Sequence, residues 1–128
     1  LIPNQPYSKN ITITRIVDAY LEHTRAWYFF NEGEENVYLA SADWMERNLH
    51  RRIEAAFPIL SVPLKQQIID ILKIQLADNQ SAAWVDENMN NIFKYNDKPP
   101  VRAQKATYEY LKKIKEGWWK AITARKII

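Results

Sequence analysis

The sequence predicts an α+β fold, in which a small mixed sheet comes first and helices pack on it. Stretches of β-branched and aromatic residues that favour strands are concentrated in the first half of the chain. Apolar residues recur at helical spacing in the second half. The chain has 128 residues, of which 47% are hydrophobic and 26% are charged, and this is enough for one domain with a core. We therefore expect one domain over residues 1–128, with a sheet part at about 1–60 and a helical part at about 61–128.

The first part contains three stretches with the pattern of strands. One alternates β-branched and polar side chains, one is mostly aromatic, and the third follows a polar turn that contains a glycine, so the last two form a hairpin. These stretches are residues 10–14, 25–30 and 37–41. A short helix is expected at residues 15–22. Residues 51–57 fit either a helix or a strand, and Pro58 favours a strand that ends near it.

The second part contains two stretches with apolar residues at helical spacing. The first, residues 63–77, is expected to form an amphipathic helix, and the second begins at Ala103 and extends at least to Ile114. Between them, residues 82–85 fit a short strand or a turn. The polar, Asn-rich residues 88–100 are expected to form a loop.

Composition excludes several classes of site. With no Cys, the chain has no disulfide, no thiolate metal site and no cysteine nucleophile. Its apolar runs are too short to span a membrane, and no signal peptide is visible. The chain begins with Leu1 in a loop-like stretch rather than with Met, so we expect it to be cut from a larger protein. Near the other end, Trp118 and Trp119 are expected to pack the last helix onto another domain.

Charge is distributed unevenly along the chain. The net charge is +3, but residues 1–62 contain six basic and eight acidic residues, whereas residues 63–128 contain 12 basic and seven acidic ones. A solvated surface of Lys-rich helices explains the basic half. A surface that faces a polyanion is the alternative.

His23 lies where the expected helix ends and the aromatic strand begins. Arg25 follows two residues later, and residues i and i+2 of a strand share a face. An imidazole beside a guanidinium suits phosphate, because the imidazole transfers protons or attacks phosphorus and the guanidinium binds two oxygens. A structural role for this pair is the alternative. The second histidine, His50, is expected to be structural or exposed.

A second polar cluster follows the returning strand. Ser41 and Asp43 are two residues apart, so a hydroxyl and a carboxylate can share a direction. Glu54 lies in an otherwise apolar stretch, and a buried acid needs a partner. We expect its carboxylate to accept a hydrogen bond from His23, and an ion pair with a neighbouring arginine is the structural alternative.

Three arginines add positive charge to the same stretch: Arg47, Arg51 and Arg52. We expect Arg47 and Arg51 to bind phosphate. Arg51 and Arg52 are the candidates for the alternative ion pair with Glu54. A solvent-facing charged turn is the structural interpretation of the whole stretch.

Six runs of residues have a recognisable order. They are Tyr-Leu-Glu-His-Thr-Arg at 20–25, Ser-Ala-Asp-Trp-Met at 41–45, Arg-Asn-Leu at 47–49, Arg-Arg-Ile-Glu at 51–54, Phe-Pro at 57–58 and Val-Arg-Ala-Gln at 101–104. Together they closely resemble the last domain of bacterial polyphosphate kinases, over about residues 1–115. The run from Ser41 to Leu49 is long and specific. Many members of that family have Gly-Arg where this chain has Asp18 and Ala19.

The family that this chain resembles looks like a distant relative of phospholipase D, in which two similar domains meet at one active site. The resemblance therefore implies a partial phospholipase-D-like catalytic domain. The relative's motif pairs His-x-Lys with a later Ser-x-Asn and an acid beyond it, and the matching positions here are His23, Arg25, Ser41, Asp43 and Glu54. Arg25 stands for Lys and Asp43 for Asn, and both changes favour a kinase over a phosphodiesterase.

The resemblance implies that the whole enzyme transfers the terminal phosphoryl group of ATP reversibly to inorganic polyphosphate through a phosphohistidine. That histidine and the Mg²⁺ ligands would lie in the preceding domain, so we expect no metal ligand in this chain and no activity from the chain alone. His23 would be a second histidine that contacts phosphate and acts as an acid, a base or an electrostatic clamp. Glu54 is the second expected catalytic residue.

The expected ligands are ATP, ADP and inorganic polyphosphate, and not nucleic acid. We expect a homo-oligomer in the cytoplasm, and a peripheral association with the inner membrane stays open. Two other functions also stay open. A phospholipase-D-like phosphodiesterase half-site would favour Lys at position 25 and Asn at position 43. A non-catalytic polyanion-binding module would rest on the basic second half, and it leaves the cluster from Ser41 to Glu54 unexplained.

Overall fold

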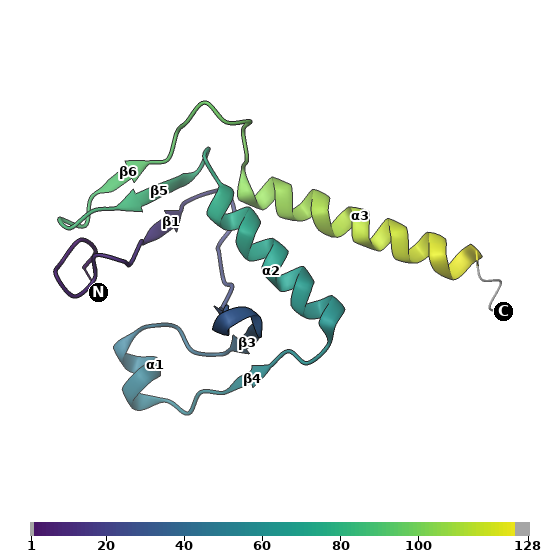
Figure 1. The fold of residues 1–128 in the computed structure, drawn as a ribbon, viewed down its shortest axis with the longest axis horizontal. Helices are drawn as coiled ribbons and strands as arrows, with labels where there is room; N and C mark the ends of the chain where they lie inside the picture. Colours follow the sequence, from purple (N-terminus) through teal and green to yellow (C-terminus); the bar gives the residue numbers. More distant parts are fainter. Residues whose placement is uncertain (1, 125–128) are drawn as a thin grey trace. The chain divides into compact units, whose positions relative to one another are not determined.

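The computed structural model describes the backbone of residues 2–124 and the side chains of residues 2–117, so Trp118 and Trp119 lie outside the described side chains. The chain forms two compact units. The first unit combines Leu1–Tyr20 with Ile74–Ile128, and the second unit is Leu21–Lys73. Each unit contains a three-stranded antiparallel sheet. The sheet of the first unit can be followed in Figure 1. The α+β class is confirmed, and the strands form two antiparallel sheets where we expected one mixed sheet.

The sheet of the second unit consists of a hairpin and one further strand. Strands β2 (Ala26–Phe29) and β3 (Asn36–Ala40) are joined by a turn that contains the 3-10 helix η1 (Asn31–Gly33). Strand β4 (Ala56–Pro58) pairs with the other edge of β3. The predicted hairpin is confirmed, and of the two alternatives for residues 51–57 the strand is observed, but only over its last part, at Ala56–Pro58. Gly33 has a φ of 102°, which only glycine adopts without strain.

Two helices belong wholly or partly to the second unit. Helix α1 (Glu46–Arg51) was not predicted, because it buries a single side chain, Asn48, and lacks the apolar stripe of an amphipathic helix. Helix α2 (Val62–Ala77) confirms the prediction for residues 63–77, and it begins in the second unit and ends in the first. Among the described residues of the second unit, the fully buried apolar side chains are Val37 and Ile69.

The first unit consists of a sheet and a long helix. Its sheet has the strand order β1 (Thr14–Ile16), β5 (Ala82–Val85) and β6 (Asn91–Phe93). Helix α3 (Ala103–Ala124) follows, and its first residue is buried. Ala82, Ala83 and Val85 on the central strand are buried as well. Of the two alternatives for residues 82–85, a strand or a turn, the strand is observed, and the predicted helix from Ala103 is confirmed.

The start of the chain differs from the prediction. The strand expected at residues 10–14 lies at β1 instead, and residues 17–25, within and just beyond the expected helix, are irregular in the described structure. Tyr20 and Leu21, two apolar residues of the expected helix, are 77% and 88% exposed. These two side chains therefore contribute little of the apolar packing that would stabilise a helix in this stretch.

Strand β6 lies inside the stretch that we expected to be a loop, and in the part of the chain that we expected to be helical. It pairs with β5 through a hairpin whose turn is closed by Asp86. The Asp86 carboxylate accepts the backbone N–H of Asn88 (3.0 Å) and of Asn90 (2.7 Å). The Asn-rich composition thus marks the turn of a hairpin rather than a long loop.

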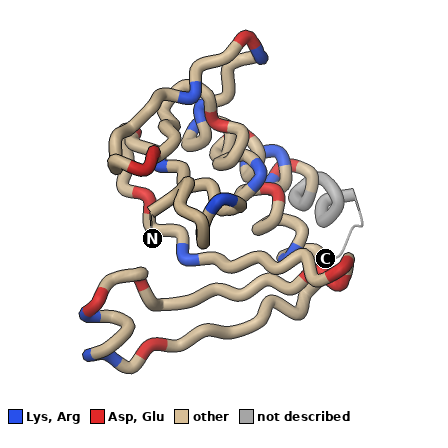
Figure 2. Tube along the Cα trace, turned by 60° about the vertical axis from the view of Figure 1, so that its left-hand side comes forward, with Lys and Arg blue, Asp and Glu red and all other residues tan. Residues whose placement is uncertain are grey.

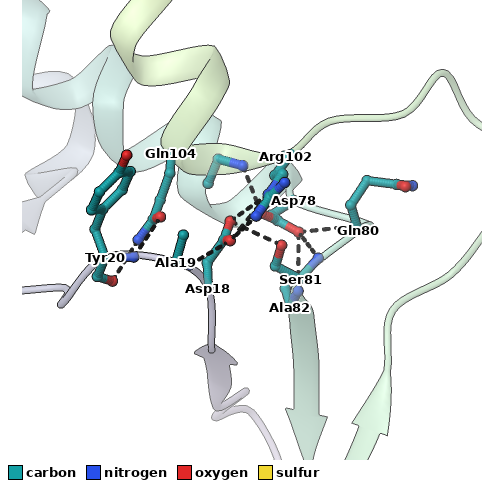
Figure 3. Close-up of polar contacts among 10 residues, drawn as sticks. Asp18, Ala19, Tyr20, Asp78, Gln80, Ser81, Ala82, Arg102 and Gln104 are labelled. Carbon is teal, nitrogen blue, oxygen red and sulfur yellow. Dashed lines mark hydrogen bonds and ion pairs between the residues drawn. The ribbon is translucent and has the colours of Figure 1, made fainter.

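A fully buried carboxylate, that of Asp78, organises the region that follows α2. Oδ1 accepts the backbone N–H groups of Gln80, Ser81 and Ala82 at 2.7–3.0 Å, and Oδ2 accepts that of Ala103 at 2.6 Å (Figure 3). Asp78 therefore caps the start of α3 from outside the helix. Burial alone would raise the pKa of Asp78, but the four backbone donors outweigh it and the pKa is lowered.

The residues after β1 are held by side chains from the rest of the first unit. Asp18 contacts Arg102, and it accepts a hydrogen bond from the Ser81 hydroxyl (3.1 Å) (Figure 3). The Gln104 carboxamide bonds Tyr20 twice, accepting from its N–H (3.1 Å) and donating to its carbonyl (2.7 Å). Side-chain bonds replace the helix that we expected here.

Lys94 is a buried cation, with 8% of its surface exposed. Its ammonium donates to the carbonyl of Leu76 at the end of α2 (2.7 Å) and lies 4.4 Å from the centroid of the Trp84 ring. Burial lowers the pKa of Lys94, and the charge of Asp78 opposes that shift.

Basic and acidic residues are interspersed along the tube in both units (Figure 2). The described helices include none with the length and apolar character that a membrane span requires.

Candidate functional site around His23 and Arg25

The predicted site residues all belong to the second unit, and the sheet places them at one end. Arg25 precedes β2, and the N–H of Ala40 at the end of β3 donates to its carbonyl (2.9 Å). Ser41 comes next, and its N–H donates to the carbonyl of Ala55, just before β4 (2.9 Å). Because neighbouring strands are antiparallel, the start of β2, the end of β3 and the start of β4 meet here.

Arg25 and Asp43 form an ion pair at this end of the sheet. The guanidinium Nε donates to Oδ1 of Asp43 (2.6 Å), and Nη2 donates to Oδ2 (3.3 Å). Their side chains are 22% and 35% exposed. The hydrogen bond from Arg25 is the main reason why the pKa of Asp43 is lowered, and the charges of Arg25 and Arg47 add to the effect.

His23 contacts the same guanidinium. Nη2 of Arg25 meets Nε2 of the imidazole. A guanidinium has only donors, so Nε2 is the acceptor, and the imidazole in this contact is neutral with its proton on Nδ1. His23 and Arg25 lie side by side as expected, although in an irregular segment and not in a strand, and their binding of phosphate stays a prediction.

Ser41 and Glu54 form a second linked group. The Ser41 hydroxyl donates to Oε2 of Glu54 and accepts the N–H of Ala55 (3.0 Å). Asn48 of α1 donates from Nδ2 to the other oxygen of Glu54, Oε1 (2.6 Å). The hydrogen bonds from Ser41 and then from Asn48 are the main causes of the lowered pKa of Glu54.

The contacts of Glu54 differ from both predictions. In the part of the chain with described side chains, its carboxylate bonds neither to His23 nor, as an ion pair, to an arginine. The reason is the pairing of β3 with β4. This pairing places Glu54, at the end of the connecting loop, next to Ser41, at its beginning. Arg25 and Arg52 act on Glu54 only through their charge, which also lowers its pKa. A catalytic role for Glu54 stays a prediction.

Arg47 and Arg51 lie on α1 and are exposed. Arg47 is near enough to Asp43 for its charge to lower the pKa of that carboxyl group. Arg51 pairs with Glu46 (3.3 Å), and both side chains are 76% exposed, so this pair stabilises the fold little. Of these two arginines, Arg47 is the one with an electrostatic link to the Arg25–Asp43 pair. His50 is exposed on the same helix.

Sequence reasoning missed Asn48, which is 4% exposed and contacts Glu54. Asparagine is more often exposed, and Asn48 stands in a charged run that resembles a solvent-facing turn. The only sequence signal is a small amide in the loop between Ser41 and Glu54, within reach of two groups that need partners. Within the described part of the chain, no group of three or more His, Asp and Glu side chains is placed to hold a metal ion.

One face of the same sheet is hollowed. A cavity of about 470 Å³ is lined by aromatic and small polar side chains. These are Trp27, Phe29, Asn31, Asn36, Tyr38 and Ala56. No charged residue is among those that line the cavity, so its chemical character differs from that of the charged region around His23.

Comparison with known proteins identifies the family. Residues 1–104 match the model of the polyphosphate kinase C-terminal domain 2. The polyphosphate kinases of Yersinia pestis and of Escherichia coli strain K12 are 46% and 44% identical to this chain over 118 residues. In both, the match covers 91% of this chain and 17% of the relative.

A crystal structure of the polyphosphate kinase from Porphyromonas gingivalis also matches. It superposes with a TM-score of 0.87 at 55% sequence identity, and the match covers 91% of this chain and 18% of that chain. This chain thus spans less than a fifth of the length of these relatives. The resemblance found in the sequence is confirmed. The chain belongs to the polyphosphate kinase family, in which it corresponds to C-terminal domain 2.

Proposed function

We propose that this chain supplies one half of the active site of a polyphosphate kinase. The whole enzyme would move the terminal phosphoryl group of ATP to a histidine of a preceding domain, releasing ADP. The phosphoryl group would then pass from that nitrogen to the terminal oxygen of inorganic polyphosphate, and both steps would be reversible. His23 and Arg25 of this chain would bind the phosphate oxygens during the transfer.

One observation carries this proposal, the position of the Arg25 guanidinium between His23 and Asp43. Phosphoryl transfer depends mainly on positioning and on neutralising the charge of the phosphate oxygens. Asp43 fixes the plane of the guanidinium through two of its nitrogens. Among the described residues the third nitrogen, Nη1, has no hydrogen-bond partner, so it is available to a phosphate oxygen.

His23 complements this donor. In the contact with Arg25 its Nε2 is an acceptor, and a phosphate oxygen that displaced this contact would need a proton on the imidazole instead. Taking up that proton would turn His23 into a cation beside the phosphate. The same proton could then be given to a leaving oxygen, which is the acid and clamp role expected from the sequence.

The predicted phosphate-binding role of Ser41 has a condition. A serine hydroxyl has one proton, and Ser41 donates it to Glu54. Ser41 would bind a phosphate oxygen only after turning away from that carboxylate. Arg47, whose charge reaches Asp43, is better placed for phosphate than Arg51, which pairs with Glu46 on the surface.

The remaining parts of the proposal concern the whole enzyme. Its substrates would be ATP, ADP and inorganic polyphosphate, and it would work as a homo-oligomer in the cytoplasm. Mg²⁺ would neutralise phosphate charge in the preceding domain. The Asp43 carboxylate is bonded to Arg25, and that of Glu54 to Ser41 and Asn48. Carboxylates with these partners do not fit a metal-binding set, so we assign the ion to no residue of this chain.

The test is His23→Ala in a full-length polyphosphate kinase that carries this sequence. Transfer of label from γ-labelled ATP to polyphosphate should be lost while the melting temperature stays the same. His50→Ala, a second histidine substitution on the exposed surface of α1, should keep full activity. A His23→Ala enzyme with the parent's rate would refute the proposal. His23-dependent hydrolysis of an activated phosphodiester, without ATP-dependent synthesis, would replace it with the phosphodiesterase half-site.

A further inference from the structure

The loop between β3 and β4 carries Asp43, so its shape decides how Asp43 meets Arg25. Side-chain bonds close this loop at its base. Ser41 at one end donates to Glu54 near the other end, and the N–H of Ala55 donates back to the Ser41 hydroxyl (3.0 Å). Ser41 and Asp43 are only two residues apart, so fixing Ser41 restricts Asp43.

Asn48 is the third member of this closure, and its orientation is determined by its neighbours. Nδ2 lies 2.6 Å from Oε1 of Glu54. The reversed carboxamide would place Oδ1 against a carboxylate oxygen, and two acceptors repel. Nδ2 must therefore face Glu54.

The opposite end of the carboxamide has no partner. Oδ1 of Asn48 is buried, and among the described residues it is without a hydrogen bond. A buried acceptor that lacks a donor lowers the stability of a fold, so packing alone does not account for an amide at this position. What the amide adds is its donor to Glu54.

We propose that Asn48 is a positioning residue for the phosphate site. It holds Glu54 against Ser41, Ser41 fixes the start of the loop, and the loop presents Asp43 to Arg25, which contacts His23. This inference rests on the proposed phosphate-binding role of His23 and Arg25. In the described part of the chain, Asn48 itself is hydrogen-bonded to neither of them.

The proposal predicts a change in pH dependence as well as in rate. The groups that act on Glu54 are the donors Ser41 and Asn48 and the charges of Arg25 and Arg52, and all of them favour the ionised carboxylate. Removing the Asn48 donor therefore raises the pKa of Glu54 toward its ordinary value. The acidic limb of the pH–rate profile should move to higher pH, because protonation of Glu54 weakens the hydrogen bond that its carboxylate accepts from Ser41.

The experiment is a double-mutant cycle in a full-length polyphosphate kinase that carries this sequence, assayed for ATP-dependent polyphosphate synthesis. Asn48→Ala should lower kcat/KM about tenfold, as expected for one lost hydrogen bond to a charged group. In a Glu54→Ala background the same substitution should change nothing further. Asn48→Asp keeps the shape but places a second carboxylate against Glu54, so it should be at least as damaging. His50→Ala, on the same helix, is the matched control and should have no effect.

Three outcomes would overturn the proposal. The first is that the effects of Asn48→Ala and Glu54→Ala on kcat/KM add. The second is a lower melting temperature with an unchanged rate and an unmoved pH profile, which would make Asn48 purely structural. The third is a fully active Asn48→Asp enzyme. If Asn48→Ala does not fold at the assay temperature, the same cycle with Asn48→Ser decides between these outcomes.

The proposed function is tested separately by His23→Ala, measured beside the cycle. A fully active His23→Ala enzyme counts against the phosphate site itself. Additive effects in the cycle, together with an inactive His23→Ala enzyme, count against the positioning role of Asn48 alone.

Discussion

Asp18 and Arg102 lie 84 residues apart in the sequence and form an ion pair in the first unit, through two nitrogens of the guanidinium. Nε of the guanidinium lies 3.0 Å and 2.8 Å from the two oxygens of Asp18, and Nη2 also contacts Oδ1. The Asp18 side chain is 2% exposed, whereas that of Arg102 is 53% exposed. The pair joins the segment after β1 to the start of α3, and the bond from Arg102 lowers the pKa of Asp18.

Asp18→Asn should destabilise the first unit. Asparagine keeps the size of the side chain but removes the charge, and one of its two polar ends donates where Arg102 also donates. We expect the melting temperature of a full-length enzyme with this sequence to fall by several degrees. Lys105→Ala, which removes an exposed cation from the first turn of α3, is the control and should leave the melting temperature unchanged. Equal melting temperatures for all three proteins would contradict a stabilising role for the pair.

The fold should lose stability in acid. Asp18, Asp43, Glu54, Asp78 and Asp86 all have pKa values below the ordinary ones. Their stabilising effect is fully present above the ordinary carboxyl pKa of about 4, and it is lost as the pH falls from there through the folded-state values. The urea midpoint should therefore fall steeply below about pH 4, and less steeply in Asp18→Asn. A midpoint that stays constant across this range would show that these carboxylates titrate alike in the folded and unfolded chains.

Arg25→Ala should weaken phosphate binding in the full-length enzyme. It removes the donor that we propose for phosphate and leaves the Asp43 carboxylate unpaired at the same place. We expect the KM for ATP to rise about tenfold or more, which is the scale for losing one charged hydrogen-bond partner. Arg25→Lys keeps the charge without the planar pair of donors, so it should recover only part of the affinity. An unchanged KM with a large fall in melting temperature would make Arg25 a structural residue.

The 128-residue chain alone should have no polyphosphate-synthesising activity. The matched region is less than a fifth of the length of its relatives, and we place the phosphorylated histidine in a preceding domain. The measurement is incorporation of γ-labelled phosphate from ATP into polyphosphate by the purified chain, with a full-length enzyme as the positive control. Synthesis above the background without protein would refute this expectation.

Local patterns predicted the elements that depend on neighbouring residues. The hairpin of β2 and β3 follows from aromatic and β-branched stretches around a turn with Gly33, and α2 follows from its apolar spacing. The contact of His23 with Arg25 was also accessible, because it joins residues two positions apart. Residues two positions apart in an extended segment share a face, so their side chains lie near each other.

Long-range contacts decided what the sequence could not predict. The segment after β1 is irregular because Arg102 and Gln104, more than 80 residues away, bind it from the side. Glu54 bonds Ser41 instead of His23 because β4 pairs with β3, a pairing that no local pattern specifies. Helix α1 buries only Asn48, so it leaves no periodic signal.

The environment of Lys94 gives the first unit a chemical reporter. Acylating reagents attack the neutral amine of lysine, and they need space around it. The ammonium of Lys94 donates to the carbonyl of Leu76 and stacks on the ring of Trp84, and the residue has little access to solvent. Its labelling by a soluble ester therefore requires the ammonium to leave the Leu76 carbonyl and the Trp84 ring, and the rate of modification at this amine reports on local opening around Lys94.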